Sequence, residues 1–506
     1  MKESIVTIGC GMVVGVDAVP VHVQATTRHA GDGTPRLLGL VDACVREAYH
    51  RVLQAFFALE LPAPRGVITV NFAPAALKKR GSGFDLPLAL ALAGAAGMFP
   101  RERARGLFAF GEVSLEGALL PARGAISVAL AARRQQAYAM LCSPKDASTC
   151  AVVDGLCVHG TPTLADAVRW LAGQDDLPPH VGANPPAAGA PQFADLGEIR
   201  GHESPKLALQ VAAAGRHNLA FSGPPGTGKS AMLRRLPGLL PPLTPSQQLE
   251  VLQVHAAAGL DLPPVDQPTL RAPHHTSSVQ GLLGGGADVR PGEVTLAHHG
   301  VLFLDELPEF RRDALEAMRQ PLEDGEVTVG RAQRTVTMPA RFLLIAARNP
   351  CPCGYLGHRQ RPCRCTPGAL TRYRSRLSGP LLDRLDLQVD VPALAASELR
   401  REEDPARSTA ALREAVLQAE DRQLARNRDR QGRFVPNGRL SGASLDQTAR
   451  ATSGAWAALD DVLTRRHESP RGRLRVLRVA RTLADLDDRD VIEDHDVLRA
   501  DVLRSG

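Results

Sequence analysis

Residues 218–230 read NLAFSGPPGTGKS, and this stretch decides the fold class of the chain. A short apolar strand runs into the pattern G-x-x-x-x-G-K-[ST], and a helical stretch follows from Ala231. Glycines let such a loop curl so that its N–H groups face phosphates at the positive end of the next helix. Because strand, loop and helix come in the required order, a chance glycine loop is a poor alternative. We expect a nucleotide cradle of Gly223, Pro224, Pro225, Gly226, Thr227, Gly228, Lys229 and Ser230, with Lys229 on the β- and γ-phosphates and Ser230 on Mg²⁺.

Two carboxylates follow a second apolar strand. Residues 301–306 read VLFLDE, so four residues of the buried type predict a central strand that ends at Asp305 and Glu306. Parallel α/β sheets bind ligands at the carboxyl ends of their strands. We expect Asp305 to hold the Mg²⁺ shell and Glu306 to orient and deprotonate the attacking water. This pattern alone is weak, but together with the glycine loop it predicts an ATPase with ATP and Mg²⁺ as cofactors.

The chain divides into segments of different character. Residues 1–172 alternate strand-like runs with helical stretches, and residues 173–194 contain five prolines and read as a linker. Residues 195–394 alternate strands and helices as a parallel sheet requires, and residues 395–506 are helical and rich in Arg, Ala and Leu. The predicted fold class is α/β, with a P-loop core and a C-terminal helical lid.

Composition narrows the possible compartments and partners. The net charge is +6 with a pI near 8.9, and no apolar run approaches the roughly 18 residues of a membrane span. The N-terminus lacks a secretory signal, so we expect a cytoplasmic protein with no membrane partner. Eight Arg and one acid lie between residues 348 and 384, and seven Arg and one acid between 465 and 481. Such runs are either solvated faces or anion-binding surfaces.

The nine cysteines do not suggest a disulfide scaffold. Five are scattered, as buried thiols of a reduced compartment are. The other four form C-x-C-x₉-C-x-C, a spacing that suits a tetrahedral structural Zn²⁺, although each pair is closer than the usual C-x₂-C. An iron–sulfur cluster and plain thiols remain as alternatives. The four expected ligands are Cys351, Cys353, Cys363 and Cys365.

Four stretches together resemble the magnesium-chelatase-like AAA+ ATPases, and within them most closely the bacterial ComM/YifB proteins. These are RAPHHTS at 271–277, GVLFLDELPEF at 300–310, NPCPCG at 349–354 and LRVLRVARTLADL at 474–486. The resemblance covers nearly the whole chain. It implies a ring-forming ATPase, a hexamer, in which Asn349 at the end of the strand 342–347 positions the attacking water.

The same resemblance implies two arginine roles. Arg384 would enter the site of the neighbouring subunit, where such a residue raises the rate by roughly 10³–10⁵, while an intrachain salt bridge with Asp383 or Asp386 is the alternative. Arg471, at the start of the last long helix, would contact the γ-phosphate, with Arg475 and Arg478 as fallbacks.

A hairpin facing the pore of the ring is also implied, formed by residues 327–329 and 336–338. Arginines at its tip and in the cysteine-rich loop would bind phosphates of single-stranded and branched DNA. With four Tyr and two Trp in the chain, base stacking should contribute little. The expected DNA contacts are Arg331, Arg334, Arg359, Arg361 and Arg364. By resemblance the function is that of a DNA helicase that migrates branches during natural transformation.

The N-terminal segment resembles the C-terminal domain of Lon proteases at GEVSLEG, residues 111–117, and at Leu120-Pro121. Lon proteases use a Ser–Lys dyad. Here Asp85 stands where the serine is expected, and the stretch Arg123-Gly124-Ala125-Ile126 has no lysine. We therefore expect a scaffold without peptidase activity.

The alternative to a DNA motor is a chelatase-type motor that acts on a protein partner for metal insertion.

Overall fold

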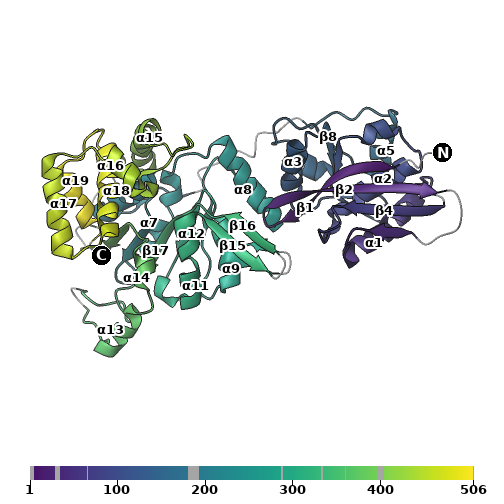
Figure 1. Ribbon diagram of the computed structural model, residues 1–506. Helices are drawn as coiled ribbons and strands as arrows, with labels where there is room; N and C mark the ends of the chain where they lie inside the picture. Colours follow the sequence, from purple (N-terminus) through teal and green to yellow (C-terminus); the bar gives the residue numbers. More distant parts are fainter. Residues whose placement is uncertain are drawn as a thin grey trace. The chain divides into compact units, whose positions relative to one another are not determined.

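The computed structural model describes residues 5–28, 35–64, 66–180, 193–286, 289–331, 334–358, 361–395, 398 and 404–504. The chain forms two compact units. The first consists of Met1–Ala187, Gln248–Pro264 and Gly286–Pro291, and the second of Ala188–Gln247, Val265–Gly285 and Gly292–Gly506. Figure 1 labels many of the helices and strands of both units.

The first unit is built on a seven-stranded mixed sheet in the order β3-β4-β2-β1-β5-β8-β9. The pairing of β1 with β2 runs antiparallel from Val6 opposite Ala25 to Val14 opposite Asp17. Helix α2 has the sequence DLPLALALAGA and is buried at every residue, as expected for a helix that is apolar all round. The strands are β1 (Val6–Val14), β2 (Asp17–Arg28), β3 (Arg36–Leu38), β4 (Val67–Ala73), β5 (Leu107–Ala109), β6 (Glu112–Val113), β7 (Leu119–Leu120), β8 (Ala139–Cys142) and β9 (Val158–Gly160), and the helices are α1 (Ala43–Ala58), α2 (Asp85–Ala95), α3 (Ala125–Arg134), α4 (Pro144–Cys150) and α5 (Leu164–Ala172).

The expected linker begins later than the sequence indicated. The N–H of His180 donates to the carbonyl of Val158 over 2.7 Å, and a ring nitrogen of His159 lies 2.8 Å from the Leu177 carbonyl oxygen. Residues 173–180 therefore pack on the first unit through one main-chain bond and one bond to the His159 side chain, which the proline-rich composition did not reveal. Residues 181–192 lie outside the described part of the chain.

The second unit contains a five-stranded parallel sheet in the order β11-β14-β17-β10-β18. Strands β10, β14 and most of β17 are fully buried, which explains their unbroken apolar sequences. Helix α6 packs on β10 and β18, and α7 packs on β17. The strands between residues 219 and 390 are β10 (Leu219–Ser222), β11 (Leu270–Arg271), β12 (Gly284–Gly285), β13 (Arg290–Pro291), which belongs to the first unit, β14 (Val301–Leu304), β15 (Glu326–Arg331), β16 (Arg334–Pro339), β17 (Leu343–Arg348) and β18 (Leu387–Asp390).

The strand order fixes where a ligand binds. Strand β10 comes first along the chain, yet it lies between β17 and β18. The chain passes from β10 to β11 at one edge of the sheet, returns through β14 to β17, and then crosses β10 to reach β18 at the other edge, so the strand order changes direction beside β10. In parallel α/β sheets the crevice at such a switch point, at the carboxyl ends of the strands, is the ligand site. The predicted α/β class with a parallel sheet and C-terminal helices is confirmed. The helices from residue 203 onward are α6 (Glu203–Gly215), α7 (Lys229–Leu233), α8 (Pro245–Ala258), most of which belongs to the first unit, α9 (Val279–Leu283), α10 (Glu293–Leu296), α11 (Arg312–Ala317), α12 (Arg319–Asp324), α13 (Pro367–Arg374), α14 (Gly379–Leu382), α15 (Thr409–Arg426), α16 (Gly442–Thr448), α17 (Ser453–Arg466), α18 (Pro470–Leu486) and α19 (Asp494–Val502).

The C-terminal helices, coloured towards yellow in Figure 1, pack around α18, which contacts α15, α17, α19 and α6. Neither interpretation of the arginine run 465–481 holds for all of it. Arg481 is fully buried, 3.1 Å from Asp485, and its guanidinium donates to the Asp490 carbonyl over 2.7 Å. Asp485 also pairs with Arg426 over 2.7 Å. These arginines belong to an internal ion-pair network, because a buried guanidinium needs charged and carbonyl partners.

Among the described residues, no helix is both long and apolar enough to cross a membrane.

Candidate nucleotide site and cysteine cluster

The glycine-rich loop connects β10 to α7, as the sequence predicted. Gly226 and Gly228 have φ angles of +80° and +82°, a region that side chains other than glycine rarely adopt. Lys229 begins α7, and its Nζ donates to the carbonyls of Gly223 and Pro224, both over 2.7 Å. Burial lowers the pKa of Lys229, and the negative charge of Asp305 opposes this shift. The lysine thus lies over a loop whose curled backbone suits phosphate oxygens.

The acidic pair lies at the same edge of the sheet. Asp305 and Glu306 follow β14 directly, and Glu306 takes a left-handed conformation with a φ angle of +52°. Its side chain is 57% exposed, so water reaches the carboxylate. The Nδ1 atom of His275 lies 3.5 Å from the Glu306 Oε2.

His275 lies in the stretch RAPHHTS, but its spacing from other residues predicts no role for it. It follows β11, and β11 pairs in parallel with β14. Both strands therefore end at the same edge of the sheet. The pairing of β11 with β14 would have predicted that His275 lies near Glu306, but a strand of two residues is too short to be predicted from the sequence.

Asn349 completes this edge from β17. The Nζ of Lys229 donates to the Asn349 Oδ1 over 3.4 Å, and the N–H of Gly223 donates to the Arg348 carbonyl over 3.2 Å. The loop, the acidic strand and the asparagine strand meet because β14, β17 and β10 are adjacent in the sheet. The structure thus brings together Lys229, Asp305, Glu306 and Asn349.

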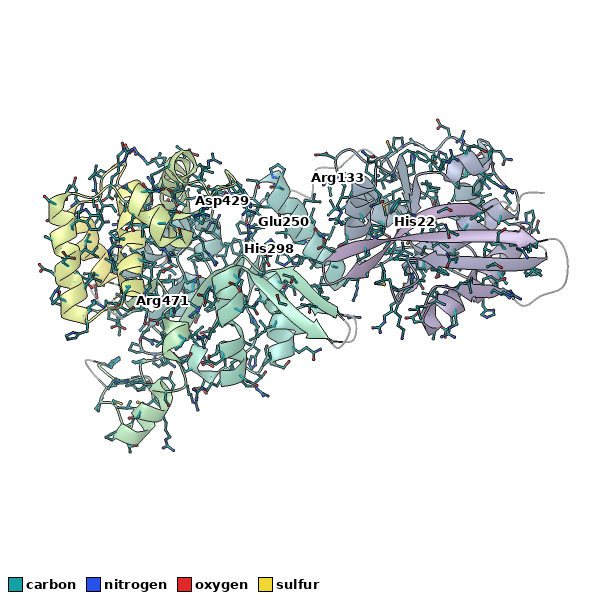
Figure 2. All side chains as sticks on the ribbon, in the orientation of Figure 1. His22, Arg133, Glu250, His298, Asp429 and Arg471 are labelled. Atoms are coloured by element: carbon teal, nitrogen blue, oxygen red, sulfur yellow. The ribbon has the colours of Figure 1, made fainter. Side chains whose placement is uncertain are left out.

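Arg384 and Arg471 lie elsewhere on the second unit. The guanidinium of Arg384 pairs with Glu323, and the charge of Arg471 acts on the same carboxylate, so the two arginines, Arg384 first, lower the pKa of Glu323. Arg471 is labelled in Figure 2 and is exposed in the first turn of α18. Among the described contacts, no hydrogen bond or ion pair joins either arginine to residues 223–228.

The alternative for Arg384 was a salt bridge within the chain to Asp383 or Asp386, but its partner is Glu323. Asp383 pairs with Arg475 over 3.2 Å, and Asp386 lies 3.4 Å from His217. Arg475 is therefore engaged within the chain, and so is Arg478, whose Nε donates to the Leu440 carbonyl over 2.9 Å. Of the three arginines considered at this helix, the exposed Arg471 is the one best able to meet a ligand.

The segment around Arg384 is held from behind by Asn218. The Asn218 Nδ2 donates to the Arg384 carbonyl, and its Oδ1 accepts the N–H of Leu344 in β17, each over 2.9 Å. One buried amide thus bonds both the arginine segment and the strand that ends near Asn349.

The four clustered cysteines have their sulfurs close together. The Sγ atoms of Cys351 and Cys353 are 3.4 Å apart, and Cys363 lies 3.7 Å and 3.6 Å from them. Cys365 joins the cluster, with all four sulfurs within 4.8 Å of one another. All four thiols are free. A tetrahedral Zn²⁺ with bonds of about 2.3 Å requires sulfurs about 3.8 Å apart, so the cluster can hold one metal ion.

Backbone N–H groups also point at these sulfurs. Leu356 donates to the Cys351 Sγ over 3.3 Å and Cys365 to the Cys363 Sγ over 3.4 Å. The N–H groups of Tyr355 and Arg364 lower the pKa of Cys353 to about 6, whereas burial and the neighbouring thiols raise the pKa of Cys363 and Cys365. Such donors stabilise thiolates, which are the form that binds metal.

Comparisons with known proteins agree with this geometry. The family described as "Magnesium chelatase, subunit ChlI" matches residues 195–399, "Subunit ChlI of Mg-chelatase" matches 23–146, and the C-terminal family of the same subunit matches 406–504. Competence protein ComM of Haemophilus influenzae is 37% identical over 483 residues, which cover 94% of this chain and 92% of that protein. The chain belongs to the ComM/YifB magnesium-chelatase-like family.

Two further relatives show the breadth of the ComM/YifB family. YifB of Escherichia coli, an uncharacterized protein, is 36% identical over 95% of this chain and 93% of its own length. An uncharacterized protein of Mycobacterium tuberculosis is 40% identical over 94% and 93%. Membership of this AAA+ group indicates an ATPase that uses ATP and Mg²⁺.

The expected DNA-contacting arginines of this ComM/YifB-family chain are partly described. Strands β15 and β16 form the predicted hairpin, and Arg331 stands opposite Arg334 at its end. The side chains of these two residues, and all of Arg359, lie outside the described part of the structure. Arg364 is exposed. Arg361 stacks on Tyr355, with its guanidinium carbon 5.4 Å from the ring centre.

Asp85, which stands where a Lon-type serine is expected, is engaged in a closed ion pair. Its side chain is fully buried and accepts from the Nη2 and Nε of Arg51 over 3.0 and 3.1 Å. The N–H of Val113 donates to the same carboxylate over 3.3 Å. With its oxygens occupied in this way, Asp85 has a structural part in the first unit.

Proposed function

We propose that this chain is an ATP-dependent DNA motor, acting as a hexameric ring that migrates DNA branches and promotes integration of DNA by homologous recombination. The observation that carries the ATPase part is the meeting of Lys229, Asp305, Glu306 and Asn349 at one edge of the sheet. Natural transformation is the proposed setting, supported by the name of the competence protein ComM.

The side chains divide the work of hydrolysis. Lys229 and the N–H groups of Gly226, Thr227 and Gly228 bind the β- and γ-phosphates. Ser230 with Asp305 would hold Mg²⁺, which would neutralise charge on those phosphates. Glu306 accepts the proton of the attacking water, and Asn349 orients that water. Arg384 serves the site of the neighbouring subunit, and Arg471 contacts the γ-phosphate. The exposed carboxylate of Glu306 fits its role, because the nucleophile comes from solvent.

The DNA part rests on arginines at the end of the hairpin and near the cysteine cluster. The hairpin of β15 and β16 ends in Arg331 and Arg334, and Arg361 and Arg364 are exposed near the cysteine cluster. Arginine binds phosphates without regard to sequence, and that affinity falls steeply with salt. Single-stranded and branched DNA are the proposed partners.

The decisive experiment measures hydrolysis and junction migration together. Single-stranded and branched DNA should stimulate the ATPase at low salt, and ATP should drive migration of a three- or four-strand junction. Arg331→Glu with Arg334→Glu should abolish migration while nucleotide binding is retained. The matched control is Arg133→Glu with Arg134→Glu, which makes the same charge change on exposed residues of α3. If DNA neither binds nor stimulates hydrolysis, the DNA function is wrong.

The alternative is a chelatase-type motor that remodels a protein partner for metal insertion. What favours it is the match to magnesium chelatase families, and the Magnesium-chelatase 67 kDa subunit of Heliobacterium mobile is 29% identical over 32% of this chain. That motor has no need of the hairpin arginines, so the double substitution above would leave its ATPase unchanged. A Lon-like protease is the weakest alternative, because Asp85 is neither a nucleophilic hydroxyl nor free of its arginine partner.

The cysteine cluster completes the proposal with one structural Zn²⁺ per chain. The four sulfurs suit a closed tetrahedral site with no vacant position. Three of them are 3.4–3.7 Å apart, and backbone N–H groups donate to sulfurs of the cluster. Such an ion is structural, since it leaves no position for a substrate.

A further inference from the structure

The residues that follow Asn349 form a loop with little regular structure. We call residues 351–376 the cysteine loop; its one helix is α13, and residues 359 and 360 lie outside the described part. The loop begins two residues after Asn349 and contacts the nucleotide site at three separate points. Each contact reaches a different segment of that site.

The first contact is with the glycine-rich loop. Gly354 has a φ angle of +82°, and a Cβ atom at this position would lie 2.7 Å from the Pro225 Cδ. The cysteine loop therefore packs directly on residues 223–228, in van der Waals contact that only glycine allows. Cys351 and Cys353 stand within three residues of this contact, and the Gly354 N–H donates to the Cys351 carbonyl over 2.9 Å.

The second contact is with Asn349 itself. The hydroxyl of Tyr373, in α13, donates to the main-chain carbonyl of Asn349 over 3.2 Å. Tyr373 is 9% exposed, so this bond is partly shielded from water. Asn349 is thus held from one side by Lys229 and from the other by α13.

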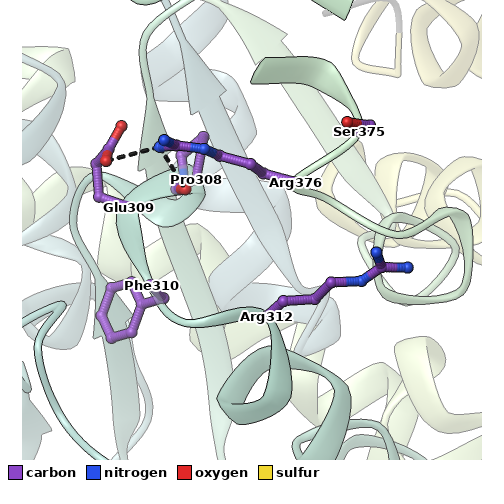
Figure 3. Close-up of a pocket in the computed structure, with 6 residues that line it drawn as sticks. All are labelled: Pro308, Glu309, Phe310, Arg312, Ser375 and Arg376. Carbon is purple, nitrogen blue, oxygen red and sulfur yellow. Dashed lines mark hydrogen bonds and ion pairs between the residues drawn. The ribbon is translucent and has the colours of Figure 1, made fainter. Parts of the chain in front are cut away.

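The third contact is with the residues after Glu306. Arg376 donates to the Glu309 carboxylate over 2.7 Å and to the Pro308 carbonyl over 3.4 Å. Figure 3 shows this guanidinium reaching the two acceptors at the rim of a hollow lined by Pro308, Glu309, Phe310, Arg312, Ser375 and Arg376. The turn that carries Glu306 is therefore braced from the end of the cysteine loop.

We propose that metal in the four-cysteine cluster controls the nucleotide site, by holding the cysteine loop against Pro225, Asn349 and Glu309. The inference rests on the ATPase part of the proposed function. Between residues 351 and 366 the described loop has no strand or α-helix, so the sulfurs are its main internal cross-link. Without metal, the loop loses that cross-link, and the three braces on the ATP site loosen together.

This differs from a cysteine loop that serves DNA alone. A loop of that kind would need its arginines exposed but would not need Tyr373 and Arg376 bonded to the nucleotide site. Metal loss would then weaken DNA binding and leave ATP binding unchanged. The two possibilities are therefore separated by measurements made without DNA.

The first experiment tests single braces in the full chain. Tyr373→Phe removes only the hydroxyl, and it should lower kcat about fivefold or more in the absence of DNA, the effect of one hydrogen bond of about 1 kcal/mol. The control is Tyr355→Phe, which removes a hydroxyl of the same loop that accepts from Arg361 over 3.0 Å and has no part in the three contacts. Equal kcat for both variants and the parent would overturn the inference.

The second experiment removes the metal. The experiment uses a Cys157→Ser background, which eliminates the exposed cysteine outside the cluster. A mercurial thiol reagent releases the zinc, and a colorimetric chelator measures the amount released. After a dithiol has stripped the mercurial, the apo-protein should bind fluorescent ADP about fivefold or more weakly, and added Zn²⁺ should restore affinity. Unchanged affinity in zinc-free protein would refute the inference while leaving the ATPase proposal intact. A holo-protein that never binds nucleotide would refute the ATPase proposal instead.

Discussion

At the scale of single residues, Glu306 has the chemistry that the proposed function depends on most. It is exposed, has a left-handed backbone and lies 3.5 Å from His275. We predict that Glu306→Gln binds ATP with near-parental affinity and hydrolyses it at least ~10²-fold more slowly, because the general base is lost and the phosphate cradle is kept. Single-turnover assays measure the hydrolysis rate, and binding of a fluorescent nucleotide measures the affinity. The control is Asp313→Asn, an exposed acid in α11; near-normal turnover of Glu306→Gln would assign the base elsewhere.

Asp146, in the first turn of α4, gives a second residue-scale prediction. It accepts the N–H of Ala122 over 3.0 Å, and burial raises its pKa to about 6. The unfolded pKa is about 3.9, so the folded state holds the proton more tightly and stability falls as the pH rises from about 4 to about 6. Asp146→Asn cannot ionise, so its stability relative to the parent should improve by about 1–3 kcal/mol between pH 4 and pH 7.

Urea unfolding measures this difference through Trp170, which lies in α5 of the same unit, with Trp456→Phe in both proteins. Asp154→Asn, an exposed substitution, provides the comparison. A stability difference between the Asp146 variant and its parent that does not change with pH would contradict the prediction.

At the scale of elements, the cysteine loop gives the third prediction. Protein purified without added metal should contain one zinc per chain, and Cys363→Ser with Cys365→Ser should contain none, because two thiolates cannot hold the ion against solvent. Elemental analysis decides it, and Cys142→Ser, away from the cluster, should keep its zinc. Iron with visible absorbance, or no metal in the parent, would refute the zinc assignment.

How much the sequence predicted also differs from element to element. The apolar runs before Gly223, Asp305 and Asn349 predicted buried parallel strands, and parallel strands place their carboxyl ends at one edge. The positions of Lys229, Glu306 and Asn349 therefore followed from local pattern. The hairpin of β15 and β16 was implied by the family resemblance and is confirmed.

Other features depend on contacts between distant segments. The bond from Tyr373 to Asn349 spans 24 residues, and the pairing of Arg384 with Glu323 spans 61. Arg481 was misjudged because arginine is mostly exposed. Its partner Asp485 lies one turn later in α18, but Arg426, which also pairs with Asp485, and the two carbonyls that accept from Arg481 come from outside this helix.

At the scale of the whole molecule, the proposed ring predicts complementation between defective chains. Arg384→Ala and Lys229→Ala should each abolish hydrolysis, yet a mixture should regain activity, because roughly a quarter of random interfaces then combine an intact cradle with an intact arginine. Mixing Lys229→Ala with Glu306→Gln should give no rescue, since both defects affect the same side of an interface. ATPase assays over a range of mixing ratios test this, and no rescue in the first mixture would make Arg384 a residue of its own chain's structure.

The amide of Asn218 has a mechanical consequence. Its nitrogen holds the Arg384 carbonyl and its oxygen holds the Leu344 N–H, so a rigid planar group a few ångströms wide spans the two segments. If β17 shifts when the γ-phosphate leaves, the Arg384 segment has to follow, or one of two shielded hydrogen bonds breaks. In the proposed ring, where each Arg384 would serve the next chain, that linkage would couple phosphate release in one subunit to withdrawal of the arginine from its neighbour.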